Sequence, residues 1–80
     1  MGVKDAVTAR FESICRERQM TVNELASRSG VTPSSVYSMM EPSRRNISIV
    51  LIKKLCDGLD MPLKEFFSGP EFDALEQEIR

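Results

Sequence analysis

The placement of helix-capping residues between positions 21 and 42 constrains the fold of this chain more than any other feature. Thr21, followed three residues later by Glu24, has the spacing of a capping box, in which each side chain bonds the other residue's backbone amide at a helix start. Gly30 suits the left-handed backbone that commonly ends a helix. The sequence therefore predicts a short helix that begins after Thr21 and ends at a sharp turn around Gly30.

A second short helix is predicted directly after this turn. Thr32 supplies a hydroxyl cap, and Pro33 takes the first helical position, where the missing amide proton costs no hydrogen bond. Pro42 ends the helix, because its ring disfavours helical backbone at the residue before it. Val36 and Met39 form the inward pair of this helix. The face left exposed consists of hydroxyl residues, namely Ser34, Ser35, Tyr37 and Ser38.

Apolar stripes at helical spacing predict three further helices, over residues 4–18, 49–59 and 62–67, and no stretch alternates like a strand. The inward residues of these helices are Val7, Phe11, Ile14 and Cys15; Ile49, Ile52, Leu55, Cys56 and Leu59; and Leu63, Phe66 and Phe67. A stripe of Phe72, Leu75 and Ile79 predicts a sixth helix in residues 71–80. That stripe either folds back on its own domain or pairs with a second copy. The fold class is all-α.

Residue types on which catalysis and metal binding depend are scarce. The chain has no histidine, which is the commonest general base and metal ligand. Cys15 and Cys56 stand alone, as expected of reduced core residues, and the four glycines are scattered instead of forming a phosphate-binding loop. We therefore expect no enzyme, no metal and no cofactor, and no small-molecule effector site is evident.

No apolar run approaches the ~18 residues that would span a bilayer. The first ten residues also lack the hydrophobic stretch of a signal peptide. The expectation is a cytoplasmic protein with no membrane association.

The charges are unevenly distributed, although the whole chain carries a net charge of only −1. Residues 28–54 hold five basic residues against one acid, a net charge of +4. Residues 71–80 hold four acids against one base, a net charge of −3. Binding to nucleic acid depends on a local basic face more than on overall charge, so the central segment remains a candidate for it.

The residues around the central turn resemble a known family. Its signature lies in small, apolar and glycine residues at the spacing of a helix-turn-helix, namely Leu25, Ala26, Gly30, Val31, Val36 and Met39. With one helix before them and two after, residues 4–67 resemble the phage repressor and Cro-like (Cro/C1-type) family of bacterial transcriptional regulators. The resemblance implies a five-helix, lambda-repressor-like DNA-binding domain over residues 1–69, followed by a C-terminal helical extension over residues 70–80.

The resemblance also implies a site on double-stranded DNA, with the third helix in the major groove. The family's base-facing positions correspond to Pro33, Ser34 and Ser38, with Thr32, Ser35 and Tyr37 close by. The loop that usually contacts backbone phosphates corresponds to Arg44, Arg45 and Asn46. Two alternatives stay open: the serines form only a solvated helix face, and Tyr37 packs against the protein instead of contacting DNA.

Three residues depart from the family pattern. Val22 replaces a common glutamine that contacts phosphate, Ser29 replaces an apolar residue and predicts a looser turn, and Pro42 replaces a glycine after the recognition helix. The predicted recognition helix also lacks the Arg, Lys, Asn and Gln side chains that form bidentate contacts with bases. Direct base readout should therefore be modest, with DNA shape contributing more of the specificity.

The sequence favours a DNA-binding transcriptional regulator, a repressor, that acts as a homodimer with the C-terminal extension as a possible dimerisation element. A different class of function remains open, namely a protein-interaction or antitoxin-like module that uses the same fold. The acidic isoelectric point and the base-poor recognition helix favour that alternative, and the positive central segment opposes it.

Overall fold

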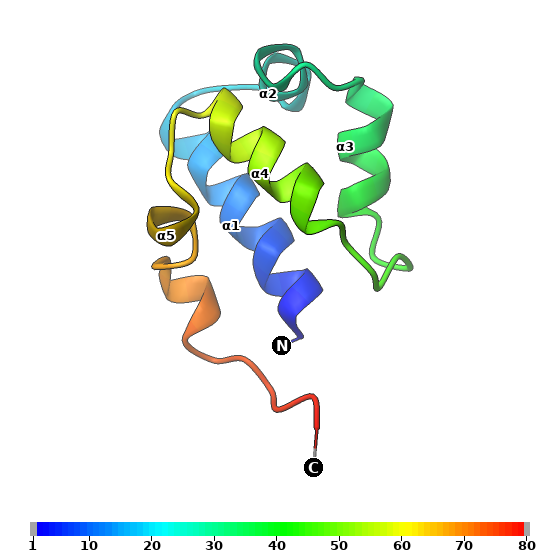
Figure 1. Ribbon diagram of the computed structural model, residues 1–80, viewed down its shortest axis with the longest axis vertical. Helices are drawn as coiled ribbons and strands as arrows, with labels where there is room; N and C mark the ends of the chain where they lie inside the picture. Colours follow the sequence, from blue (N-terminus) through cyan, green and yellow to red (C-terminus); the bar gives the residue numbers. More distant parts are fainter. Residues whose placement is uncertain (1, 80) are drawn as a thin grey trace.

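A computed structural model describes residues 2–79, and this part of the chain contains helices and no strand. The elements are α1 (Val3–Glu17), α2 (Val22–Ser29), α3 (Pro33–Met40), α4 (Ile49–Gly58), α5 (Leu63–Phe66) and a 3-10 turn, η1 (Pro70–Phe72). The prediction of an all-α domain with five helices is confirmed. Helices α1 and α4 form two sides of the core, α2 lies across one end of them, and α3 stands at the edge opposite α5 (Figure 1).

The capping residues between positions 21 and 42 act as the sequence predicts. Thr21 Oγ1 accepts a hydrogen bond from the Glu24 amide at 3.1 Å, and the Glu24 carboxylate accepts one from the Thr21 amide at 3.3 Å. Gly30 has φ 69° and ends α2 in the left-handed conformation. Thr32 caps α3 through the Ser35 amide at 3.3 Å. The turn that orients α3 against α2 is therefore specified by local chemistry.

The core brings together apolar side chains from all five helices. Phe11 of α1 and Phe66 of α5 lie at its centre, with ring centroids 4.4 Å apart. Leu25 and Ala26 of α2 and Val36 of α3 are fully buried in the same cluster. Both cysteines are free buried thiols, as expected.

Two residues predicted to face inward do not do so. Ile49 is 58% exposed, because it begins α4 at the end farthest from α2 (Figure 1), beyond the helices that cover the rest of α4. Phe67 is 37% exposed, since it follows the last residue of α5 and covers Phe66 and Phe72 from outside, with centroids 5.0 Å from each ring. The prediction that these two side chains belong to the core was wrong.

Helices α2 and α4 approach closely at Ser29 and Gly58. A Cβ atom on Gly58 would lie 2.1 Å from Ser29 Oγ and 3.0 Å from Ser29 Cα. The Ser29 hydroxyl donates to the Leu25 carbonyl at 2.7 Å, so this polar group is satisfied inside its own helix. The loosening predicted at Ser29 is not observed, because glycine on the facing helix lets the two backbones come together.

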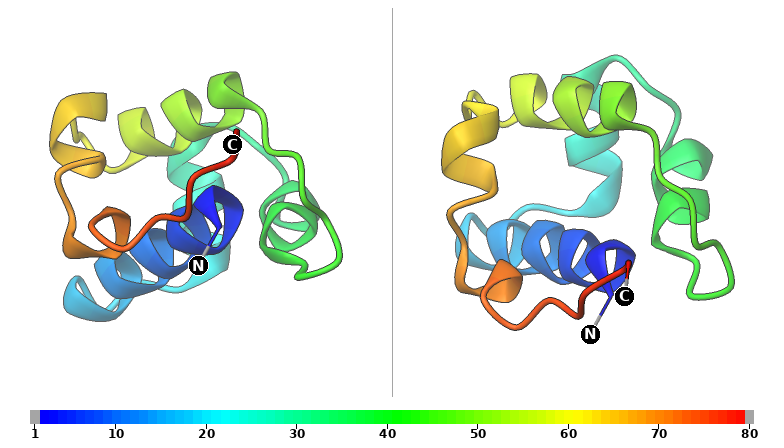
Figure 2. Two further views of the ribbon diagram at one scale, coloured as in Figure 1. Left: turned by 90° about the horizontal axis from the view of Figure 1, so that it is seen from below. Right: turned by 60° about the horizontal axis from the view of Figure 1, so that its bottom comes forward.

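The predicted C-terminal helix is present only as the 3-10 turn η1, and residues 73–79 contain no helix. Phe72 packs against the Phe66 ring at 5.8 Å, and Glu71 accepts a hydrogen bond from Ser13 at 2.8 Å. Beyond this anchor the chain runs beside α1 toward its N-terminal end (Figure 2). A helix this short needs packing to be stable, and here only Phe72 reaches the core. Ile79 is 82% exposed.

Candidate nucleic-acid interface

Helix α3 presents one apolar and one polar face. Val36 and Met39 are buried against the core, whereas Ser34 and Ser38, four residues apart, lie on the exposed side. Tyr37 is 56% exposed and lies outside the core, so its side chain does not pack in the interior of the domain. The exposed face is therefore made of small hydroxyl groups with one aromatic ring beside them.

The hydroxyl groups at the N-terminus of α3 are hydrogen-bonded to one another. Thr32 Oγ1 lies 2.9 Å from Ser35 Oγ and 3.3 Å from Ser34 Oγ. Each hydroxyl has one proton to donate and two lone pairs, and it rotates to suit its partner. The cluster therefore holds its side chains in place and still offers donors and acceptors to solvent or to a ligand.

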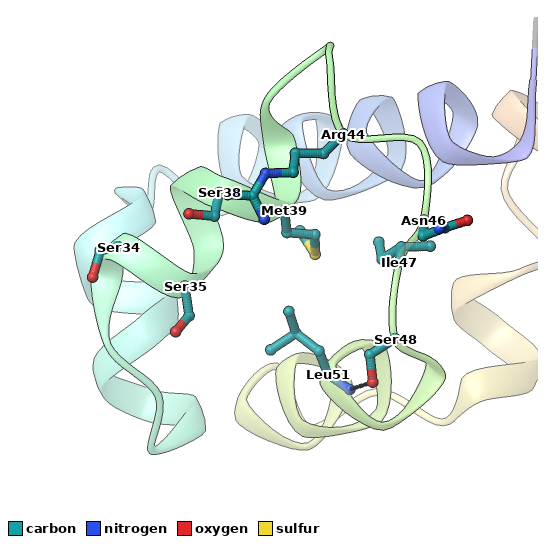
Figure 3. Close-up of a pocket in the computed structure, with 9 residues that line it drawn as sticks. All are labelled: Ser34, Ser35, Ser38, Met39, Arg44, Asn46, Ile47, Ser48 and Leu51. Atoms are coloured by element: carbon teal, nitrogen blue, oxygen red, sulfur yellow. Dashed lines mark hydrogen bonds between the residues drawn. The ribbon is translucent and has the colours of Figure 1, made fainter.

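A hollow separates α3 from the first turn of α4 (Figure 3). Its polar rim comes from α3 and from the loop before α4, and its floor is apolar. The lining residues are Ser34, Ser35, Ser38, Met39, Arg44, Asn46, Ile47, Ser48 and Leu51. The structure thus places Asn46 across the hollow from the α3 serines, and these predicted site residues share one surface.

Arg44 and Arg45, adjacent in sequence, lie in different surroundings. Arg44 lines this hollow and a second one with Ser34, Tyr37, Ser38 and Glu41. Arg45 instead points to α1, where its guanidinium donates to both carboxylate oxygens of Asp5, at 3.3 and 3.2 Å. The Arg45 guanidinium also donates to the Pro42 carbonyl at 3.0 Å. The hydrogen bond from Arg45 lowers the pKa of Asp5 below its usual value, and the same bond raises the pKa of Arg45.

The role of Lys4 was not predicted from the sequence. Its side chain is buried, with 2% exposure, and its ammonium group donates to the Glu41 carbonyl at 3.0 Å. Glu41 is the C-cap of α3, where the last carbonyls of a helix favour a positive charge. Lys4 lies three residues before Val7 on the inward stripe of α1, and this position was the signal that its side chain faces the core.

Other basic side chains stabilise the fold itself. Arg18 donates to the Leu59 carbonyl at 2.6 Å, and Arg10 donates to the Phe66 carbonyl at 2.8 Å. Lys53 forms an ion pair with Asp57 on the exposed side of α4. Within residues 2–79 no group of His, Cys, Asp and Glu side chains is placed to hold a metal ion, and none of the helices is long and apolar enough to cross a membrane.

Two helices joined at a left-handed glycine, with the second helix exposed beside a basic loop, define a helix-turn-helix DNA-binding domain. The family model of the Cro/C1-type helix-turn-helix DNA-binding domain matches residues 10–70, and the chain belongs to this family. No curated protein sequence matches the chain at a significant level. The resemblance stated from the sequence is confirmed at the level of the family and of DNA binding.

Proposed function

We propose that this protein is a sequence-specific transcriptional regulator that places α3 in the major groove of DNA and acts as a repressor. The observation that carries the proposal is the exposed hydroxyl face of α3, which shares a hollow with Arg44 and Asn46 in a domain of a DNA-binding family. A domain bound over a promoter blocks access of the transcription machinery without catalysis. Such a regulator acts on DNA in the cytoplasm and needs no cofactor or small-molecule effector.

The polar face of α3 would contact the bases. Ser34 and Ser38 project from one side of the helix, with Pro33 at its first position. Thr32, Ser35 and Tyr37 flank them, and hydroxyl groups either donate to or accept from base edges. Small side chains would also let the helix approach the groove closely. Because hydroxyls discriminate less than bidentate side chains do, this face alone would give a modest preference.

The loop after α3 would contact the backbone. Asn46 lies on the far rim of the hollow, where a phosphate would pass. Arg45 would add a second phosphate contact by giving up its ion pair with Asp5. This ion pair is exposed and therefore contributes little to stability. Such contacts fix the orientation of the protein on DNA and carry no sequence information.

A homodimer would supply the affinity that one small domain lacks. Two copies on a two-fold axis set their recognition helices one DNA turn apart, about 34 Å, and bind a roughly palindromic site. We place the second copy against the C-terminal segment, residues 70–80, because Leu75 and Ile79 are exposed there and the acidic segment repels phosphate. The domain proper would then be residues 1–69, with this segment as its dimerisation element.

Light scattering across concentration tests the dimer. The variant Leu75→Asp/Ile79→Asp keeps Phe72 on the core and should remain folded but monomeric. Val50→Asp is the matched control, because Val50 is similarly exposed on α4, away from the segment. A monomeric wild-type protein at high micromolar concentration would refute the dimer, and loss of the dimer in the Val50 variant alone would move the interface to α4.

Selection of bound duplexes from a random DNA library tests the function itself. The wild-type protein should enrich a palindromic consensus and bind it more tightly than a scrambled duplex of equal length. Ser34→Ala and Ser38→Ala should change the consensus while leaving stability within about 0.5 kcal/mol of wild type, as expected of surface substitutions. Equal binding of the selected and scrambled duplexes would contradict the proposal.

The second candidate is a protein-interaction or antitoxin-like role for the same fold. It is favoured by a recognition helix without Arg, Lys, Asn or Gln and by an isoelectric point of about 5.4. This role predicts that no consensus emerges from the selection. An antitoxin-like protein that binds both DNA and a partner would show a consensus, together with a stable complex with that partner.

A further inference from the structure

Helix α3 lacks the side chains that discriminate bases most strongly. Its eight residues, PSSVYSMM, include no arginine, lysine, asparagine or glutamine. A guanidinium that donates to guanine O6 and N7 at once is the commonest specific contact in the major groove. Strong direct readout of a base by this domain therefore requires a long donor from outside α3.

Arg44 is placed to be that donor. It lines both hollows on the exposed side of α3, and Ser34 and Ser38 line the same two hollows. Figure 3 shows its side chain extending from the loop back over α3 toward Ser38. The guanidinium thus lies on the face that would enter the groove.

The backbone of Arg44 is fixed to the end of α3. Its amide donates to the Glu41 carbonyl at 3.0 Å. The same carbonyl accepts the ammonium group of buried Lys4 at 3.0 Å. The turn that directs Arg44 is therefore tied both to the recognition helix and to α1, and the side chain starts from a defined position.

The guanidinium itself is available to a ligand. Within residues 2–79 it has no hydrogen-bond or ion-pair partner, whereas the guanidinium of Arg45 is held by Asp5 and the Pro42 carbonyl. The nearest acid on its hollow is Glu41, whose carboxylate accepts a hydrogen bond from Ser43 at 3.4 Å. Of the two loop arginines, only Arg44 is both free and turned toward α3.

We infer that Arg44 is the main specificity-determining residue and that it donates to the O6 and N7 edge of one guanine per half-site. The inference rests on the proposed function, and it assigns Arg44 to a base instead of the phosphate contact expected from the sequence. Arginine suits this role because its planar fork matches two acceptors simultaneously, which a lysine ammonium does not. The serines then tune the neighbouring positions, and Arg45 and Asn46 contact the backbone.

Selection and titration with four proteins test the inference: wild type, Arg44→Ala, Arg44→Lys and, as the matched control, Arg45→Ala. Arg44→Ala should lose the preference for guanine at one position of each half-site. Its affinity for each half-site should fall about 5- to 150-fold, the range for one bidentate base contact, and its affinity for random DNA should fall far less. Arg44→Lys should retain part of the preference, and Arg45→Ala should retain all of it.

A modified base supplies an independent readout. Replacing that guanine by 7-deazaguanine removes the N7 acceptor, so it should weaken binding of the wild type. The same replacement should have almost no effect on Arg44→Ala, because the contact is already absent. Melting of each variant by circular dichroism confirms that it is folded, as expected for an exposed side chain.

Three outcomes would overturn the inference. If Arg44→Ala keeps the wild-type consensus and loses affinity equally for all DNA, with a salt slope smaller by about 0.9 per half-site, then Arg44 contacts a phosphate. If its loss is confined to an A·T-rich position instead of a guanine, Arg44 lies in the minor groove. In both cases the proposed function stands. If the wild type shows no consensus at all, the proposed function fails and this inference fails with it.

Discussion

The contact between Gly58 and Ser29 makes Gly58→Ala a sharp test of the packing of α2 on α4. The added Cβ would lie 2.1 Å from Ser29 Oγ and 3.0 Å from both Cα and Cβ of Ser29. The hydroxyl can rotate away, but it then gives up its 2.7 Å bond to the Leu25 carbonyl. The Cα atom cannot move without shifting α2, so the substitution displaces the first helix of the helix-turn-helix.

Two opposing effects set the size of the loss. Overpacking of a close-packed contact costs about 1–3 kcal/mol. Alanine gains up to ~1 kcal/mol over glycine in a helix interior, and less here because Gly58 is the last residue of α4. The free energy of unfolding should therefore fall by about 1–2 kcal/mol. For a domain of this size that lowers Tm by roughly 4–16 °C.

Thermal and urea unfolding followed by circular dichroism measure the loss. A double-mutant cycle with Ser29→Gly measures the side-chain part of the contact, because that variant removes both Oγ and Cβ and leaves Cα. Gly58→Ala should cost at least ~0.5 kcal/mol less in the Ser29→Gly background than in the wild type, which is the scale of coupling between touching residues. A Gly58→Ala protein as stable as the wild type would refute the close approach, and an equal loss in both backgrounds would assign the loss to Ser29 Cα instead of the Ser29 side chain.

Gly30→Val should lose about 1–3 kcal/mol, because φ is 69° at this residue and a β-branched side chain is strained there. Gly30→Asn should melt close to the wild type, because asparagine tolerates this conformation and a Cβ atom at this position meets no atom within 4 Å. Equal melting of the two variants would contradict a left-handed turn. Burial raises the pKa of Cys56 from an ordinary 9.0 to about 11, so its contribution to stability should be complete below pH 9 and disappear as pH rises to about 11. A Cys56→Ala variant with the same alkaline fall would contradict this. Asp5→Asn removes the ion pair that holds the Arg45 guanidinium, so binding to random DNA should become stronger at low salt. An unchanged affinity in anisotropy titrations would mean that Arg45 does not contact phosphate.

Local signals in the sequence predicted the helix-turn-helix almost completely. Its caps and its turn are specified by the neighbouring sequence. Thr21 bonds Glu24 and Thr32 bonds Ser35, each only three residues further along, and the left-handed turn needs only Gly30 itself. The polar face of α3 was also predictable, because Val36 and Met39 were expected to face inward and both are buried. The assignment of these polar residues to bases remains a prediction.

Features that depend on distant residues were not predictable. Arg45 meets Asp5 forty residues away, and Lys4 meets the Glu41 carbonyl thirty-seven residues away, so no local pattern revealed either partner. The C-terminal stripe failed for a related reason. Its spacing is helical, but only Phe72 packs against the core. Apolar spacing alone does not show whether the rest of the domain offers an apolar surface on which the helix can pack.

We propose that α3 and the loop after it form the DNA-binding surface. The most direct test is to follow backbone amide chemical shifts of the labelled protein during titration with the selected duplex. If this surface binds the duplex, the largest changes fall on residues 32, 34–38 and 44–46, with little change in residues 73–79. Changes concentrated in α5 or the C-terminal segment, or none outside random scatter, would contradict it.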